Sequence, residues 1–267
     1  MKQTPVSQTA SRKAAWDPLF HERSPLFWPI RAAASTFSGF AAWPSVEEYH
    51  RALGEGFPVR FREPPPKPRR RRARRGPVDA SALYDARIHL EGWVPTRPES
   101  WHDFLNMLAW VAFPRAKAEL HARQLRAMSA RLEAGARTLP GARTREQDGL
   151  AILDEGGLLV LCEERWRPDL QDALEERRPD AVREIVRAGG AAALIFGHAL
   201  YESLVQPGPA IHAMAHVLPC PAPLPGPAAR VALADALLRD ALADPESFSR
   251  PERFRSLPLD ERVLCGG

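Results

Sequence analysis

The feature that most restricts the fold of this chain is a proline- and arginine-rich segment at residues 63–78, with the sequence EPPPKPRRRRARRGPV. Its prolines favour extended polyproline geometry and its cations repel one another, so the segment cannot contribute to a packed core. We therefore expect a linker between an aromatic-rich segment at residues 16–62 and a main domain at residues 79–245. Residues 1–15 and 246–267 are expected to be tails.

The positive charge of the chain comes from this linker. Seven lysines and arginines lie at residues 67–75, and without them the formal net charge of +4 becomes −3. Such a tract predicts salt-sensitive, sequence-independent binding to nucleic acid, because neutralised phosphates release counterions. It contains no aromatic side chain, so base stacking is not indicated. The alternative, which we favour, is a passive solvated linker.

The composition is that of a globular protein, with 45% hydrophobic and 26% charged residues, and it excludes collagen-like, coiled-coil and wholly disordered classes. The first 15 residues are polar and lack the apolar stretch of a secretory signal. The longest apolar run, residues 191–196, is far shorter than the ~20 residues that cross a bilayer. The three cysteines form no C-x-x-C pair, which argues against a disulfide framework. We expect a cytoplasmic protein without a membrane partner.

The main domain shows both helical and strand patterns. Apolar residues at helical spacing predict a helix over 101–112, and Pro114 is suited to open the next one. Further helices are expected over a charged stretch split at Pro179 and over 228–243. Partial alternation predicts a strand at 84–92, a hairpin is expected at 150–161 with its turn at 154–157, and residues 191–205 form a compact apolar element. The fold class is therefore α+β and predominantly helical: one main domain with one or two short hairpins, on which the aromatic-rich segment packs.

The first strong helix carries an unusual second face. Opposite its apolar stripe lie His102, Asp103, Asn106 and Trp110, where an exposed helix would carry lysine or glutamate. His102 and Asn106 are four residues apart, so they can converge as a base and an amide at a pocket floored by Trp110. The alternative for both is a structural hydrogen bond. For Asp103 we favour helix capping, because Ser100 stands three residues before it.

Three cations near this helix suggest an anion site. Arg115 and Lys117 lie in the first turn of the helix that Pro114 opens, where the macrodipole disfavours positive charge. An anion bound by the free N–H groups would explain them, and Arg97 could add a bidentate contact. The alternative is that these side chains are solvated surface cations.

A second polar pair lies in the apolar element at 191–205. His198 and Glu202 are four residues apart on a segment that is apolar nearly all round, so they must pair or bind something. One interpretation makes both ligands of a divalent metal, completed by Asp154 or Glu155. The interpretation that we favour is a closed pair between His198 and Glu202, with Asp154 and Glu155 as ordinary turn residues.

Several of these blocks resemble a known family. Residues 96–117, 148–156 and 196–202 are similar to a bacterial, mostly proteobacterial family of proteins of unknown function. The resemblance extends over about residues 16–62 and 80–220 and leaves out the arginine tract. It implies a cytoplasmic protein of about this size, and it implies no activity, cofactor or partner.

Together these observations predict a hydrolase or transferase with a polar, metal-assisted pocket for a phosphate-bearing substrate. The expected catalytic residues are His102, Asn106, His198 and Glu202. The expected substrate-binding residues are Arg97, Trp110, Arg115 and Lys117. The cofactor is left open: the metal interpretation adds a divalent ion with candidate ligands His198, Glu202, Asp154 and Glu155, whereas the favoured closed pair needs none. The alternative function is a nucleic-acid-associated or protein-interaction module without catalysis, which uses the arginine tract.

Overall fold

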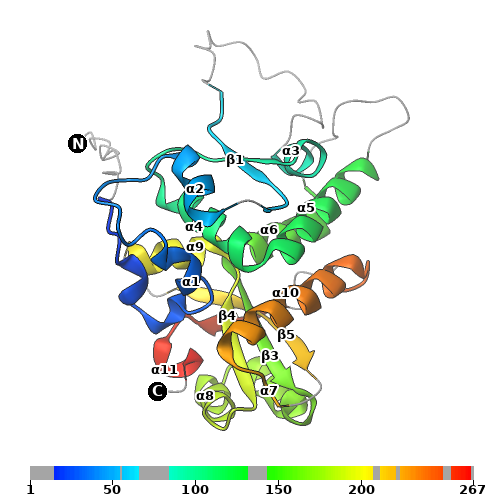
Figure 1. The fold of residues 1–267 in the computed structure, drawn as a ribbon. Helices are drawn as coiled ribbons and strands as arrows, with labels where there is room; N and C mark the ends of the chain where they lie inside the picture. Colours follow the sequence, from blue (N-terminus) through cyan, green and yellow to red (C-terminus); the bar gives the residue numbers. More distant parts are fainter. Residues whose placement is uncertain are drawn as a thin grey trace, which may run out of the picture.

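The structure is a computed structural model that describes residues 15–54, 56–65, 84–131, 143–206, 211–220, 223–248 and 254–265. The arginine tract at 67–75 lies outside the described residues. These residues form a predominantly helical α+β fold, which confirms the predicted class (Figure 1). Among the described helices, none has the length and apolar character needed to span a membrane.

A four-stranded mixed sheet forms the centre of the fold, with strand order β4-β3-β5-β6. The strands are β3 (Gly157–Glu163), β4 (Ala191–Ile195), β5 (His212–Cys220) and β6 (Arg255–Pro258). β3 runs parallel to β5, whereas β4 and β6 are antiparallel to their neighbours. Residues 255–258, which we expected in a tail, therefore form an edge strand, and α11 (Glu261–Leu264) follows it.

Helices cover both faces of this sheet. Alternate residues of β3 point to opposite faces and so contact different groups of helices. Leu158 and Val160 pack with α7 (Arg167–Glu175) and α8 (Pro179–Arg187), which are split at Pro179 as predicted. Leu159 and Leu161 pack with the other group of helices. That group comprises α5 (Pro114–Ser129), α6 (Arg145–Gly156) and α10 (Pro227–Ala243), and α10 crosses in front of the sheet in Figure 1. The sheet is thus the middle of three layers.

The aromatic-rich segment packs on the main body. It contains two short 3-10 turns (Phe20–Glu22 and Pro25–Phe27), α1 (Arg31–Ser35), α2 (Val46–Leu53) and β1 (Arg60–Arg62). β1 pairs in parallel with β2 (Trp93–Pro95). The rings of Phe20, Phe37 and Tyr49 are buried against Phe104 of α4 (Trp101–Ala112), a helix with the predicted bounds. This aromatic packing positions α4 in the fold.

The strand expected at 84–92 is wrong, since residues Tyr84–Glu91 form helix α3. The alternation that suggested a strand includes Leu90, which is 62% exposed and so does not mark a buried face. Gly92 ends the helix with a φ of 66°, a backbone conformation that glycine adopts without strain. α3 packs beside α5, where Asp85 forms an ion pair with His121.

The hairpin expected at 150–161 is also wrong. Thr144 and Gln147 form a capping box that starts α6, so Asp154 and Glu155 lie in the last turn of a helix. The apolar run after Gly157 is the fully buried central strand β3. Such a strand has polar residues on neither face, and its sequence therefore lacks the alternation of an exposed hairpin.

The apolar element expected at 191–205 is two elements rather than one. Residues Ala191–Ile195 form β4 and residues His198–Val205 form α9, with a break at Gly197. An apolar run alone does not distinguish a buried strand from a buried helix, which explains the merged assignment.

We predict that His216 makes the fold sensitive to mild acid. Its ring packs on Phe248, with the ring centroids 4.8 Å apart, and burial lowers the pKa of His216 from 6.5 to about 4. The unfolded chain therefore binds this proton more readily, and the free energy of unfolding falls as the pH drops from 6.5 towards 4. In urea titrations, the free energy of unfolding of the His216→Phe variant should fall less between about pH 7 and pH 5 than that of the wild type. The exposed His212 on the same strand supplies the control, and an unchanged loss in His216→Phe would contradict the prediction.

Candidate metal centre

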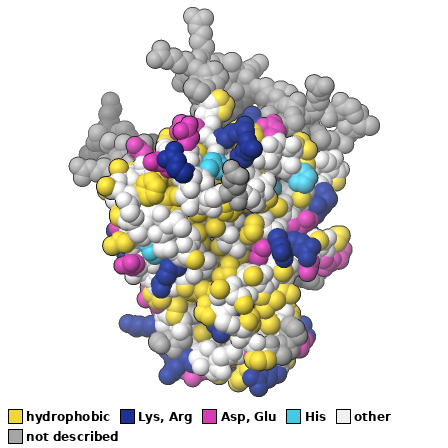
Figure 2. Space-filling view, viewed as in Figure 1, with side chains coloured by type: hydrophobic (Ala, Val, Ile, Leu, Met, Phe, Trp, Pro, Cys, Tyr) yellow, Lys and Arg dark blue, Asp and Glu magenta, His cyan; other side chains and the backbone are white. Residues whose placement is uncertain are grey.

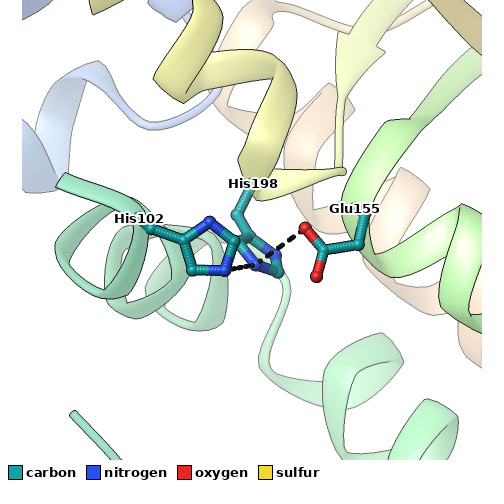
Figure 3. A group of neighbouring side chains, drawn as sticks. All are labelled: His102, Glu155 and His198. Atoms are coloured by element: carbon teal, nitrogen blue, oxygen red, sulfur yellow. Dashed lines mark hydrogen bonds and ion pairs between the residues drawn. The ribbon is translucent and has the colours of Figure 1, made fainter. Parts of the chain in front are cut away.

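Three helices bring His102, Glu155 and His198 together. His102 lies in the first turn of α4, Glu155 in the last turn of α6, and His198 is the first residue of α9. Their side chains point toward one another in Figure 3, and one ligand atom from each lies within 4.8 Å of the other two. The two Nε2 atoms are 3.0 Å apart, and Nε2 of His198 is 3.4 Å from Oε2 of Glu155.

Gly197 allows this meeting of α6 and α9. A Cβ at residue 197 would lie 2.5 Å from both the carbonyl oxygen of Glu155 and the amide nitrogen of Gly157. The amides of Phe196 and Gly197 both donate to the carbonyl of Gly157, at 3.0 and 2.9 Å. The absence of a side chain thus places His198 directly against the end of the helix that carries Glu155.

Each histidine has a carboxylate beside its Nδ1 atom. Nδ1 of His102 is 2.9 Å from Oε2 of Glu202, and Nδ1 of His198 is 3.9 Å from Oδ2 of Asp154. The first contact is a hydrogen bond, whereas the second is too long for one, and Nδ1 of His198 has no hydrogen-bond partner among the described residues. A carboxylate bonded at Nδ1, as in His102, leaves Nε2 to face a metal, which is the usual arrangement around histidine ligands. A tetrahedral zinc ion with bonds of about 2.0–2.1 Å separates its ligand atoms by about 3.3 Å. Two of the three separations, 3.0 and 3.4 Å, are close to this value, and the third, between His102 and Glu155, is within 4.8 Å.

Metal binding needs neutral imidazoles and an ionised carboxylate, and the surroundings of the three residues act on these forms in different directions. Burial lowers the pKa of His198 to about 3, so its ring is neutral near neutral pH. The hydrogen bond with Glu202 raises the pKa of His102 and so favours its protonated form, which means that a metal ion has to displace a proton to bind there. Burial and the neighbouring Asp154 raise the pKa of Glu155, and a bound cation would relieve both effects.

The predicted pair between His198 and Glu202 is wrong. Although the two residues are four apart on α9, Glu202 binds His102 on α4 instead, and His198 turns toward α6. Glu202 therefore orients a histidine and is not among the residues that could hold the ion. Asp154, also a candidate ligand, lies 3.9 Å from Nδ1 of His198 and makes its hydrogen bond with Lys117 instead.

Lys117 does not form the expected anion site. Its side chain is fully buried, and Nζ lies 2.5 Å from Oδ1 of Asp154. Although burial raises the pKa of the Asp154 carboxyl, the Lys117 ammonium lowers it well below its usual range. The cation also lies over the rings of Trp110 and Phe196, at 5.9 and 5.6 Å from their centroids. Lys117 thus neutralises a carboxylate behind the candidate metal centre.

A cavity of about 350 Å³ opens beside the three residues. It is lined by Pro64, Tyr84, Pro95, Arg97, His102, Asp103, Asn106, Asp154, Glu155 and His198. Asn106 donates through Nδ2 to the hydroxyl of Tyr84 at 3.1 Å, and its buried Oδ1 has no partner among the described residues. An acceptor left open beside the cavity is suited to an N–H or O–H group of a bound molecule.

Arg97 and Asp103 form a bidentate pair at the edge of the cavity. Nε and Nη2 of Arg97 donate to the two carboxylate oxygens of Asp103, at 2.9 and 2.7 Å. Ser100 caps the helix as predicted, but the Asp103 carboxylate binds Arg97 and does not complete the capping box. Arg97 nevertheless keeps 62% of its side chain exposed beside the cavity.

Arg115 and Trp110 lie away from the cavity, contrary to the prediction. Pro114 opens α5 as expected, but the anion at the start of this helix is the protein's own Asp235. Its carboxylate accepts from the amides of Arg115 and Ala116, at 3.3 and 2.8 Å. The ring of Trp110 is buried and stacks on His121, with centroids 5.5 Å apart. Neither residue lines the cavity.

Tyr84 is the site residue that the sequence analysis did not identify. It lay at the start of the segment interpreted as a strand, so its hydroxyl was not connected with Asn106 on α4. The available signal was Gly92, which is typical of a helix end and would have favoured a helix from Tyr84 onward.

The chain belongs to a family described as a protein of unknown function (DUF3025), whose model matches residues 73–261. The matched region includes α4, α6 and α9, which carry His102, Glu155 and His198, and it leaves out residues 16–62, to which we expected the resemblance to extend. No curated protein and no solved structure matches the chain.

Proposed function

We propose that this protein is a cytoplasmic, divalent-metal-dependent hydrolase whose metal is held by His102, His198 and Glu155. The observation that carries the proposal is the convergence of three ligand atoms within 4.8 Å, from three separate helices, beside an open cavity. Two histidines and one glutamate are a known ligand set for catalytic zinc. With three protein ligands, a fourth position remains for water on the cavity side.

The surrounding residues have distinct roles in this proposal. A bound zinc ion would lower the pKa of its water to about 7 and polarise a substrate carbonyl. Glu202 holds the ring of His102 in the orientation that presents Nε2 to the ion. The free Oδ1 of Asn106 accepts a hydrogen bond from the substrate, and Tyr84 holds the Asn106 amide in place.

The charge balance favours a neutral substrate. The carboxylates in and beside the cavity are Asp103, Asp154, Glu155 and Glu202. Arg97 and Lys117 neutralise two of them, and a divalent ion balances the other two. No excess of positive charge remains for a phosphate dianion, so we propose a small ester or amide as the substrate class.

The test compares hydrolysis of p-nitrophenyl acetate and p-nitrophenyl phosphate by the protein loaded with Zn²⁺. We expect the protein to hydrolyse the ester, and we expect chelation of the metal to abolish this activity. The rate of ester hydrolysis should fall at least a hundredfold in Glu155→Gln and in His198→Ala. Glu155 is half exposed, so its substitution leaves the fold intact, whereas His198 is buried. The exposed His212 provides the control substitution to alanine. Hydrolysis that survives chelation, or that Glu155→Gln does not reduce, would overturn the proposal.

A further inference from the structure

A second cavity, larger than the one at the metal centre, lies along α10. Its volume is about 1120 Å³, and it separates α10 from α1, from the end of α4 and from the start of α5. Most of its lining is apolar, and the walls include Trp28, Val111, Ala112, Ala228, Val231 and Ala232. Figure 2 shows hydrophobic side chains gathered on the lower half of this face, over the position of α10 in Figure 1. We call this cavity the α10 groove.

The groove follows about two turns of α10. Pro227 and Ala228 lie at one end, followed along the helix by Val231, Ala232 and then Asp235. Eight residues of helix span about 12 Å. With C–C bonds of about 1.5 Å in a zigzag, an alkyl chain of about ten carbons has the same length. Several of the residues along this path are alanines, which leave room for such a chain.

The two ends of the groove differ in charge. At the Pro227 end lies Arg31, whose guanidinium donates to the carbonyl of Ser24 at 3.4 Å. The first turn of α10 begins at the same end, where Gly226 offers no side-chain cap; Pro227 has no N–H, so the amides of Ala228 and Ala229 are the ones that could bind an anion. At the other end lie Asp235 and Arg115, and the Asp235 carboxylate accepts from the amides of Arg115 and Ala116 and lies in the field of the Arg115 charge. Because the cation at this end already has a carboxylate beside it, a ligand anion is favoured at the Pro227 end.

His21 is a second, independent sign of a ligand. It lines the groove, is only 3% exposed, and its Nδ1 has no hydrogen-bond partner in the described part of the chain. An unpaired polar atom at such a buried position costs free energy unless a bound molecule or water satisfies it. Arg31 donates to the carbonyl of Ser24, three residues after His21 in the chain, and both Arg31 and His21 line the groove. Glu22, which is exposed, lines it as well.

We propose that the α10 groove binds an aliphatic carboxylate of about ten carbons. The carboxylate lies against Arg31 and the first turn of α10, within reach of the unpaired nitrogen of His21. The alkyl chain follows α10 past Val231 and Ala232 and excludes water from the apolar walls. This binding site is independent of the metal centre.

Calorimetric titration of the full chain with decanoate tests the proposal, with decanol and decyltrimethylammonium as probes that share the alkyl chain. We expect saturable binding of one decanoate, about tenfold tighter than decanol, and no binding of the cation. Arg31→Gln should weaken decanoate about tenfold without affecting decanol, and Glu22→Gln should strengthen it. The exposed Arg51 serves as the control arginine.

Filling the groove provides the second measurement. Ala232→Trp should abolish decanoate binding. Ala229 is an exposed residue of the same helix that does not line the groove, so Ala229→Trp should leave the binding unchanged. Equal affinity for the three head groups, or equal binding by the two tryptophan variants, would overturn the proposal, since either result indicates adsorption to apolar surface elsewhere. The absence of saturable decanoate binding would overturn it as well.

Discussion

Replacing Lys117 by methionine is expected to lower the free energy of unfolding by about 3–5 kcal/mol. Lys117 is fully buried, and its ammonium lies 2.5 Å from Asp154, whose side chain is only 13% exposed. Methionine fills a similar volume, so the main effect is an unpaired carboxylate beside the buried ring of His198. Urea unfolding followed by circular dichroism measures the change, with a midpoint shift at constant slope.

Two further variants separate this ion pair from simple packing. The double variant Lys117→Met/Asp154→Asn removes both charges and should recover a large part of the stability that Lys117→Met loses. Arg126→Met on the same helix breaks an ion pair with Glu119 whose arginine is 56% exposed, and it should cost at most about 1 kcal/mol. A loss in Lys117→Met as small as that in Arg126→Met, or a double variant no more stable than Lys117→Met, would contradict the prediction.

Part of the candidate site could be predicted from the sequence. His102 and Asn106 stand where an exposed helix would carry lysine or glutamate, His198 stands in an apolar segment, and the structure brings all three to one cavity. The long, strongly periodic helix over 101–112 had the predicted bounds because many residues contribute to the same pattern. A polar residue within such a pattern is informative, since it needs a partner once it is buried.

The pairing of these residues could not be predicted in the same way. Glu202 binds a histidine 100 positions earlier in the chain, and Asp235 caps a helix that begins about 120 positions before it. Spacing within one helix predicted that Glu202 pairs with His198. The position of Arg115 in the first turn of a helix predicted an anion from outside the protein. Contacts between distant segments depend on how the layers stack, and a single sequence carries no direct signal for that. The capping box at Thr144 was a local signal, and it would have placed Glu155 on a helix facing α9.

Substitutions at the candidate metal centre are expected to produce large and graded losses of Zn²⁺ affinity. The wild-type chain should bind one Zn²⁺ in a calorimetric titration after chelator treatment, and Co²⁺ in its place should give the absorption bands of a four-coordinate ion. His198→Ala and His102→Ala each remove a ligand, and each should lower the affinity by more than a hundredfold. Glu202→Gln leaves the ligands in place but loosens the ring of His102, so it should lower the affinity by about 10–100-fold.

This order distinguishes a metal centre from a hydrogen-bonded cluster. If the two histidines and Glu155 only bond one another, Zn²⁺ would neither bind with a defined stoichiometry nor stabilise the fold. If they hold an ion, Zn²⁺ at about a hundred times its Kd should stabilise the wild type by about 2.7 kcal/mol, and the thermal midpoint should rise accordingly. Glu175→Gln, which alters an exposed ion pair with Arg255, should bind and respond as wild type does. Equal affinities in wild type, His198→Ala and Glu202→Gln would show that the ion binds elsewhere. A loss in Glu202→Gln that lies between wild type and the histidine variants would assign Glu202 its orienting role, because only a residue that acts through His102 weakens the site without removing a ligand.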